Sequence, residues 1–489
     1  MRPLPPWIPP VAAALCALGP AIALRGFTVD DALITARYAA HLAAGLGYRF
    51  NPGGPITDGV TPLGWAHALA PFAGPGPLAA LAAAKLLGAL GWLAAAALLG
   101  AAVARTSDRP IRFAALLLIA ASAPLGAWSV SGMETGVVAA LGALAAALPE
   151  LGRPRLGAAC AGIAAGLRPE FLAFSLVLAA ATPWATRPAA SSSPSSSPSS
   201  RSRWPAWIAP LALALAPFLT AAALRSILFG RPAPLSVLAK APDATLGLRY
   251  AAACFLLTGP VALVAPLAWR RLRRWPRGLL LAVAVHFVAV AAAGGDWMPL
   301  SRLVVPALPA VVLAAAHIAS VADVRATAAR LALALAGEIF VIGKIGPAAA
   351  QVGADRLQII EELRGALADA RVVAALDIGW LGAATPATTT IVDLAGVTDP
   401  AIAALPGGHT TKRIPVGLLD ARRVDTLVML LRPGETLETP WTASRFARGV
   451  EQYIASFPGL GEEFAPAAVG AAPHLRYVVL RRVASSSTR

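Results

Sequence analysis

Two adjacent carboxylates, Asp30 and Asp31, follow the first apolar segment of the chain in the stretch GFTVDDALITARYAAH. A carboxylate held beside a hydroxyl group can act as a general base and take its proton. If residues 30–44 form a helix, its periodicity gathers one set of side chains on a single face: Asp30, Ile34, Arg37 and His41. The neighbouring face carries Asp31, Thr35 and Tyr38. The stretch therefore predicts a helix with a polar stripe that faces a cavity, with Arg37, Tyr38 and His41 as candidate substrate-binding residues.

One of the two acids also has a purely structural interpretation. Thr28 precedes Asp31 by three residues, the spacing of a capping box, which would stabilise the helix start by about 1 kcal/mol. Asp30 has no such role, and the helix dipole is expected to lower its pKa. We therefore favour Asp30 over Asp31 as the base, and expect both at the catalytic centre.

Four more segments place charged residues next to apolar ones: SGMET, GLRPEF, FGRPAPLSVLAK and GGDWMPLSR. A charge at membrane depth costs about 2.5–3.5 kcal/mol, so such residues are candidates for function. The candidate residues in these segments are Glu134, Arg168, Glu170, Arg231, Lys240, Asp296 and Arg302. Each also has a local interpretation: Ser131 and Glu134 form a capping pair, Arg168 and Glu170 form an ion pair, and the others flank helices.

The composition indicates the elements that position these residues. Hydrophobic residues make up 57% of the 489 residues and charged residues only 13%, too little polar surface for a water-soluble chain of this size. We expect a polytopic α-helical membrane protein with about ten or eleven transmembrane helices of about 20 residues each. The expected spans are 7–24, 77–104, 112–130, 133–149, 156–183 as a broken hairpin, 205–229, 247–269, 278–294, 303–320 and 328–350.

The 41 basic residues outnumber the 25 acidic ones, and their positions indicate orientation rather than nucleic-acid binding. With a retained N-terminal helix and a cytoplasmic N-terminus, the arginine groups between the spans all fall on the cytoplasmic side, as the positive-inside rule requires. The five polar segments then lie at or near the external side. The three cysteines lie in apolar segments and predict neither a disulfide nor a metal site.

Two further regions differ from the helical part, which we assign to residues 1–350 with a first external loop and juxtamembrane helix at 25–60. Residues 184–204 are rich in Ser and Pro and predict a flexible cytoplasmic linker. Residues 351–489 alternate a helical stretch with short strand-like runs and predict a small extracytoplasmic α/β domain. The strand-like runs are RVVAALDIG, TTTIVDLAG, VDTLVMLL and HLRYVVLRR. Asp377, Asp393 and Asp399 follow such runs, and turn formation and acceptor binding both remain open for them.

A base at the water boundary, arginines for a phosphate and a lipid-facing surface together fit transfer of a sugar from a polyprenyl-phosphate donor. The base would activate an acceptor hydroxyl, and guanidinium groups would stabilise the departing phosphate. We assign the candidate residues other than the two acids to the donor phosphate and substrate. The partners are then the donor, a glycan or other hydroxyl acceptor and the bilayer. Neither a metal nor another cofactor is required.

The order of motifs, DDALITARYAAHLAAGLGYRFNPG, SGMET, RPE, FGRPAP, GGDWMPLSRLVVPALP, DIGWLG and VDLAGVTDP, resembles bacterial membrane glycosyltransferases of the C fold (GT-C), in particular the polyprenyl-phosphate-dependent cell-wall arabinofuranosyltransferases. The resemblance covers nearly the whole chain. It implies inverting transfer outside the plasma membrane, with Asp30 and Asp31 at the catalytic centre and Asp296 and Arg302 in the GGD…R loop. The segment NPGGPITDGVTPLGW is less aromatic than is typical of arabinosyl transfer, so arabinofuranose, another pentose and a hexose all remain open.

Two other classes of function remain. A polytopic transporter or a flippase of lipid-linked sugars would also bury charged residues, although the sequence shows no pair of related halves such as many carriers have. A scaffold without catalytic activity would anchor the external domain for assembly of the cell envelope, and its Asp30 and Asp31 would matter only for stability.

Overall fold

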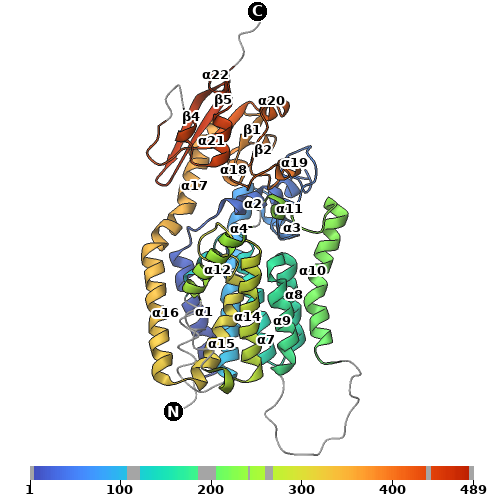
Figure 1. Ribbon diagram of the computed structural model, residues 1–489, viewed down its shortest axis with the longest axis vertical. Coiled ribbons are helices and arrows are strands. Elements are labelled where there is room, and N and C mark those ends of the chain that lie inside the picture. The colour runs from blue at the N-terminus through green and yellow to red at the C-terminus, as the bar shows by residue number, and fades with distance from the viewer. Residues whose placement is uncertain are drawn as a thin grey trace, which may run out of the picture. The chain divides into compact units, whose positions relative to one another are not determined.

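The computed structural model describes residues 5–106, 122–185, 205–239, 243–258, 268–436 and 442–483. Figure 1 shows a mostly helical chain with a small C-terminal sheet. Contacts divide it into two compact units. Unit 1 comprises residues 1–25, 85–223 and 242–349, and unit 2 comprises residues 26–84, 224–241 and 350–489. The loop after the first helix therefore belongs to the same unit as the C-terminal domain.

Unit 1 is a bundle of helices. Its helices are α1 (Ile8–Ala23), most of α4 (Pro77–Thr106), α6 (Ala123–Ser129), α7 (Thr135–Glu150), α8 (Pro154–Leu167), α9 (Leu172–Ala181), most of α10 (Ile208–Phe229), α12 (Ala244–Thr258), α14 (Arg274–Ala292), α15 (Leu308–Val321), α16 (Val324–Lys344) and the start of α17 (Gly346–Leu367). Short 3-10 turns flank them: η2 (Pro169–Phe171), η3 (Thr182–Trp184), η5 (Trp269–Arg271) and η6 (Val305–Ala307).

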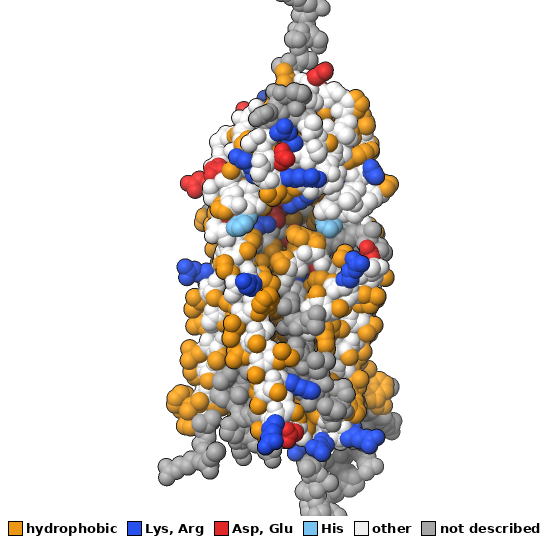
Figure 2. Space-filling view, turned by 60° about the vertical axis from the view of Figure 1, so that its left-hand side comes forward, with side chains coloured by type: hydrophobic (Ala, Val, Ile, Leu, Met, Phe, Trp, Pro, Cys, Tyr) orange, Lys and Arg blue, Asp and Glu red, His pale blue; other side chains and the backbone are white. Residues whose placement is uncertain are grey.

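Within the described residues, four helical stretches are long and apolar enough to cross a membrane: Pro77–Arg105, Ile208–Phe229, Arg274–Ala292 and Val324–Leu367. Shorter apolar helices lie at Ile8–Ala23, Thr135–Glu150, Pro169–Trp184 and Val305–Val321. These helices coincide closely with the expected spans. Figure 2 shows a broad band of hydrophobic side chains on the surface of the helical part. The Ser/Pro linker and parts of the expected spans 112–130 and 247–269 lie outside the described residues.

The hairpin expected at 156–183 is confirmed, because α8 ends at Leu167 and α9 begins at Leu172. Arg168 is extended (φ −133°, ψ 95°), as expected for the residue before Pro169. The Arg168 amide still bonds to the Ala164 carbonyl at 2.8 Å, so the helix ends in an orderly turn. This break places Arg168 and Glu170 at one end of the bundle rather than on a helix flank.

Small residues let these helices approach closely. A Cβ atom built on Gly142 of α7 would lie 2.1 Å from the Pro306 carbonyl oxygen, a distance that side chains do not reach. The backbones of α7 and η6 therefore touch at this position. Ala is the commonest buried residue along α7 and α15, so these two helices pack largely through small side chains.

Unit 2 contains a five-stranded sheet in the order β2-β1-β3-β5-β4. The strands are β1 (Val372–Ala375), β2 (Thr390–Asp393), β3 (Thr426–Leu430), β4 (Phe464–Ala472) and β5 (Leu475–Arg482). β1 pairs in parallel with β2 and β3, while β5 pairs antiparallel with β3 and β4. The helices of this part are α17, α18 (Ile378–Ala384), α19 (Pro400–Ala403), α20 (Leu418–Ala421), α21 (Gly449–Ala455) and α22 (Leu460–Glu463), with η7 (Ala443–Arg445). The α/β domain is therefore confirmed as a fold.

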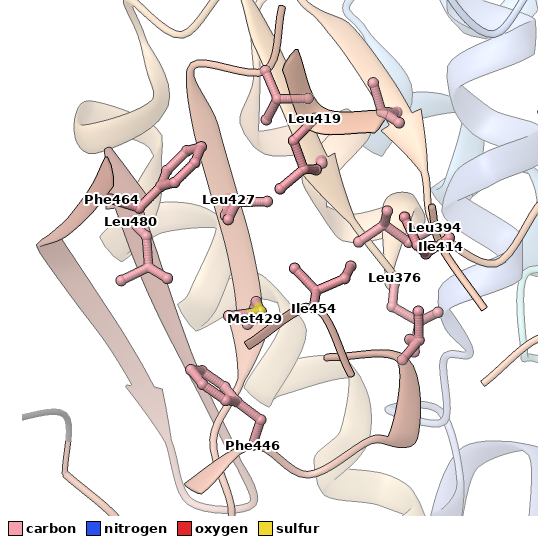
Figure 3. Packing of buried hydrophobic residues seen from close by; sticks show 14 of the residues in the cluster. Leu376, Leu394, Ile414, Leu419, Leu427, Met429, Phe446, Ile454, Phe464 and Leu480 are labelled. Carbon is pink, nitrogen blue, oxygen red and sulfur yellow. The ribbon is translucent and has the colours of Figure 1, made fainter. Parts of the chain in front are cut away.

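Alternation along the strands builds the core of this domain. Leu427 and Met429 are two residues apart on β3 and share a face of the sheet, together with Leu480 of β5. Figure 3 shows these side chains gathered with Ile454 and Phe446 in one cluster. All five are fully buried.

The sequence did not predict the strand β4, which lies at the edge of the sheet. Side chains of α17 cover its unpaired edge. Its sequence, FAPAAVGAA, lacks the regular alternation of a half-buried strand. From α17, Gln358 donates to the Ala471 carbonyl oxygen at 2.9 Å, and Glu362 accepts from the Ala471 amide at 2.8 Å. Two side chains thus replace a neighbouring strand at this edge.

Residues 26–84 of unit 2 contain α2 (Asp30–Ala43), α3 (Trp65–Leu69) and η1 (Ala70–Phe72), and residues 224–241 contribute α11 (Leu235–Ala239). The predicted capping box at α2 is wrong. Val29 is the N-cap residue without a side-chain bond, and the Thr28 hydroxyl donates to the Gly26 carbonyl oxygen at 3.3 Å. The predicted helix itself is present, and α2 packs against α18.

The contact between α2 and α18 requires glycine at position 379. A Cβ atom there would lie 2.0 Å from the Asp30 carbonyl oxygen, so Gly379→Ala should push the helices apart and cost about 1–3 kcal/mol. Gly365→Ala is the matched control, because nothing lies within 4 Å of that position in the exposed part of α17. We expect a lower apparent melting temperature for the first variant only. Equal melting temperatures would contradict the close packing.

Candidate functional site

The predicted polar face of α2 is a packing face. Both carboxylate oxygens of Asp30 accept backbone hydrogen bonds at the start of α18, from the amides of Gly379 and Trp380, each at 2.8 Å. The Arg356 side chain of α17 lies 3.7 Å from the same carboxylate. Asp30 is only 6% exposed. Its carboxylate is therefore occupied by the α/β domain rather than presented to a substrate.

This environment changes the proton affinity of Asp30 in the direction opposite to the one expected. Burial raises the pKa of Asp30 to about 6, and the nearby carboxylate of Asp377 raises it further, against the lowering effects of Arg356 and the two amides. The helix dipole of α2 does not dominate, because loss of water from a buried carboxylate is the larger effect. A pKa in this range would suit a base, but access to the carboxylate is blocked.

Sequence reasoning missed the polar network that surrounds Asp30. Asp377, the N-cap residue of α18, accepts a hydrogen bond from the Tyr477 hydroxyl and lies 2.7 Å from the Arg448 guanidinium. The rings of Trp380 and Tyr477 lie 4.8 Å apart. These residues come from β5, α18 and the start of α21, so no local spacing could have related them to Asp30. They bury and fix the acid rather than form an open pocket.

The other two aspartates considered for acceptor binding form turns. Asp393 accepts from the amides of Ala395, Gly396 and Thr398, and burial raises its pKa to about 6. Asp399 caps α19 through the amides of Ala401 and Ile402. Their contacts favour the turn interpretation.

Arg37 lies two turns after Asp30 on the same face. Its guanidinium donates to the carbonyl oxygens of Phe50 (3.0 Å), Gly382 (3.0 Å) and Thr389 (2.8 Å). Its side chain also reaches the Thr385 hydroxyl at 3.2 Å. The side chain is 1% exposed, and burial lowers its pKa to about 10. These contacts hold the loop after α18 in place, so they give Arg37 a structural role.

Tyr38 and His41 also make internal contacts. The Tyr38 hydroxyl lies 2.7 Å from the Thr57 hydroxyl, and burial raises its pKa well above the usual value. His41 Nδ1 lies 2.8 Å from the Arg49 carbonyl oxygen, and burial lowers its pKa. Arg37 and His41 line a cavity of about 280 Å³, together with small residues of the turn at 73–77. Tyr38 does not line it.

Asp31 differs from its neighbour, because its side chain is partly exposed. Arg231, which follows α10, is also partly exposed and lies near Asp58. Asp58 forms a buried ion pair with Arg225 at 2.9 Å, a pair that the sequence did not suggest. Lys240 lies outside the described residues.

Unit 1 brings the remaining candidates together. The Arg168 guanidinium lies 2.8 Å from the carboxylates of both Glu134 and Glu170, and the predicted local pair is thus confirmed but incomplete. The capping role predicted for Glu134 is wrong, because its side chain makes no cap bond and Ser131 bonds to the Trp128 carbonyl. Glu134 and Arg168 are fully buried, and Oε2 of Glu134 and both Nε and Nη2 of Arg168 have no hydrogen-bond partner in the described residues.

Asp296 and Arg302 lie 3.5 Å apart in the loop between α14 and α15. This loop is strained, since the consecutive residues Leu300 and Ser301 have φ values of 57° and 58°. Three side chains that sequence reasoning missed hold it. Trp128 donates to the Leu300 carbonyl, while the Tyr250 hydroxyl and His286 bind the amide and carbonyl of Leu303.

We call Glu134, Arg168, Glu170, Asp296 and Arg302 the bundle cluster. Three carboxylates outnumber two guanidinium groups, so the cluster does not favour an anion such as phosphate. The opposite ends of these helices meet elsewhere, where Glu150 of α7 contacts Trp275 of α14 at 2.9 Å and His317 of α15 at 2.6 Å. The arginines at 153, 155, 270–277 and 325 flank that opposite end.

Comparison with known proteins gives no further assignment: no protein-family model, no curated protein and no solved structure matches this chain. Among the described residues, no group of three or more His, Cys, Asp or Glu side chains could hold a metal ion.

The raised pKa of Asp30 predicts a pH dependence of stability. Because the folded state binds this proton more tightly than the unfolded state, stability should fall as the pH rises from 3.8 to about 6. Asp30→Asn cannot titrate, so its apparent melting temperature should fall less than that of the wild type over this range. Asp393 titrates in the same direction and is present in both proteins, so the difference isolates Asp30. Parallel curves would contradict the assignment.

The bundle cluster predicts a strong effect at Arg168. Arg168→Met leaves two buried carboxylates without their cation, which should cost about 3–5 kcal/mol. Adding Glu134→Gln and Glu170→Gln should recover much of the loss in apparent melting temperature. Arg270→Met, at an exposed arginine, is the control. If Arg168→Met and the control melt alike, the charges are not coupled.

Proposed function

We propose that the protein is a glycosyltransferase of the bacterial plasma membrane. It transfers a sugar from a polyprenyl-phosphate donor to a hydroxyl group of a cell-envelope glycan or another acceptor outside the cytoplasm. This is the activity that the GT-C resemblance implies, and the acid residues at the start of α2 are its chemical basis.

Membrane insertion and orientation rest on the four long apolar helices and on the arginines. The arginines flank the end of the bundle where Glu150 and His317 meet, and the positive-inside rule makes that end cytoplasmic. The bundle cluster then lies at the external end. Residues 26–84 and 350–489 form one compact unit, and one compact unit lies on one side of a membrane. The first loop and the C-terminal domain are therefore both extracytoplasmic in this proposal.

One observation carries the proposed chemistry: the adjacent acids have different surroundings. Asp30 is buried and accepts two backbone hydrogen bonds, whereas Asp31 is partly exposed in the same helical turn. The capping interpretation that disfavoured Asp31 no longer applies, since Thr28 bonds elsewhere. We therefore propose Asp31, not Asp30, as the general base.

In the reaction, the acceptor oxygen forms a bond to the anomeric carbon while the bond from that carbon to the phosphate oxygen breaks. The acceptor proton passes to the Asp31 carboxylate, and polyprenyl phosphate leaves with the electron pair. Attack opposite to the leaving group inverts the anomeric configuration.

The bundle cluster also favours a second function, a transporter or flippase of lipid-linked sugar. Buried charges among apolar helices are typical of substrate and ion pathways. The two functions differ in what they require: transport depends on Arg168 but not on a base at the start of α2, whereas transfer depends on that base.

The test is sugar transfer by the purified protein in membranes that contain a lipid-linked donor and a hydroxyl acceptor. Asp31→Asn removes the base and should lower kcat by about 10²–10⁴-fold while the protein still folds. Asp369→Asn, at an acid that is 84% exposed, is the matched control and should keep full activity. Full turnover by Asp31→Asn would exclude Asp31 as the base. Movement of the intact lipid-linked sugar without any transfer would favour the flippase.

A further inference from the structure

We propose that the C-terminal α/β domain is a positioning element for the base, and that Asp30, Arg37 and Asn51 of the first loop are the residues that fasten it. This inference rests on the proposed function, because it assigns these residues a role relative to Asp31. It differs from acceptor binding, in which the α/β domain would contact substrate.

The contacts of Asp30 and Arg37 both lie on one face of α2. Their partners lie at the two ends of α18. Asp30 accepts the amides of Gly379 and Trp380 in the first turn of α18. Arg37 donates to the Gly382 carbonyl near its end. Glycines at both positions permit the approach: a Cβ at 379 would meet Asp30 backbone atoms, and one at 382 would lie 2.8 Å from Arg37 Cδ. α2 and α18 are thus joined along two helical turns.

The third fastening lies at the edge of the sheet. The side-chain amide of Asn51 donates to the Ile391 carbonyl oxygen and accepts from the Ile391 amide, both at 2.8 Å. A neighbouring strand would offer β2 the same pair of bonds. One side chain therefore completes the outer edge of β2 and fixes the turn after α2 to the sheet.

The residues that precede α2 are also held in place, by contacts with α17. The Gly353 amide donates to the Gly26 carbonyl at 2.8 Å, and the Arg356 guanidinium donates to the Thr28 carbonyl at 2.9 Å. The first loop is thus fixed before, along and after α2. All of these partners belong to residues 350–489.

These contacts determine where Asp31 points. Successive side chains of a helix diverge by about 100°, so a helix fixed at two positions two turns apart cannot rotate or slide. Asp31 is adjacent to the first of these positions. A base that is displaced by about 1 Å loses about 10²-fold in rate, so the fastening residues should affect kcat without touching substrate.

The experiment uses Asn51→Ala in the full chain, because Asn51 is twenty residues from Asp31 and bonds only to backbone in the described residues. Gln358→Ala is the matched control. It too removes a side-chain amide that bonds an edge strand of the same sheet, but at β4 and without contact to α2. Two quantities are measured: hydrogen exchange of the amides of α2 and Ile391, and kcat and KM for transfer.

We expect Asn51→Ala to speed exchange at Ile391 and in α2 by about tenfold or more, and to lower kcat by about tenfold or more with KM for the donor within about twofold. Gln358→Ala should speed exchange only in β4 and keep kcat. Asn51→Ser serves as the second variant if Asn51→Ala does not fold.

Unchanged hydrogen exchange in α2 would show that Asn51 does not hold this helix, and would overturn the proposal. Faster exchange with unchanged kcat would overturn the positioning role while the proposed function stands. A wild-type protein that transfers no sugar would overturn the proposed function and with it the positioning role. The hydrogen-exchange result would then test only whether Asn51 holds α2 against the α/β domain.

Discussion

The carboxylate of Asp30 at the first turn of α18 is the interaction on which unit 2 depends. A buried carboxylate is costly to remove from water, and here two backbone amides and Arg356 compensate for that cost. The contact also requires Gly379, since any side chain there would collide with the Asp30 backbone. Through this contact the loop after α1 becomes part of the same compact unit as the C-terminal sheet.

Unit 1 also buries acidic side chains, but their charges are compensated in a different way. In unit 2 a buried acid is satisfied by backbone amides, whereas in the bundle cluster Arg168 is shared between two acids and polar atoms of Glu134 and Arg168 have no bonding partner in the described residues. The strained backbone at Leu300 and Ser301 adds to the cost. A fully satisfied cluster is typical of a structural contact, while an incompletely satisfied one beside a strained loop is typical of a binding site.

The sequence predicted the elements better than their contacts. Hydropathy located the helices of the bundle, and Pro169 located the break between α8 and α9, because both signals are local. The periodicity of α2 correctly grouped Asp30 with Arg37, yet the face packs on α18, a partner that no spacing can reveal. The strand β4 was missed because its Ala, Pro and Gly residues lack alternation. It pairs with β5, and Gln358 and Glu362 of a distant helix bond to its free edge at Ala471.

The separation between Asp30 and its partner has a consequence for biosynthesis. Gly379 follows Asp30 by 349 residues, almost the whole length of the bundle. At a synthesis rate of about 5–20 residues per second, the first loop waits roughly 20–70 s before α18 has been made. During that time Asp30 is without its partners on α18, and most helices of the bundle are synthesised. Completion of the loop is therefore among the last events in the maturation of the protein.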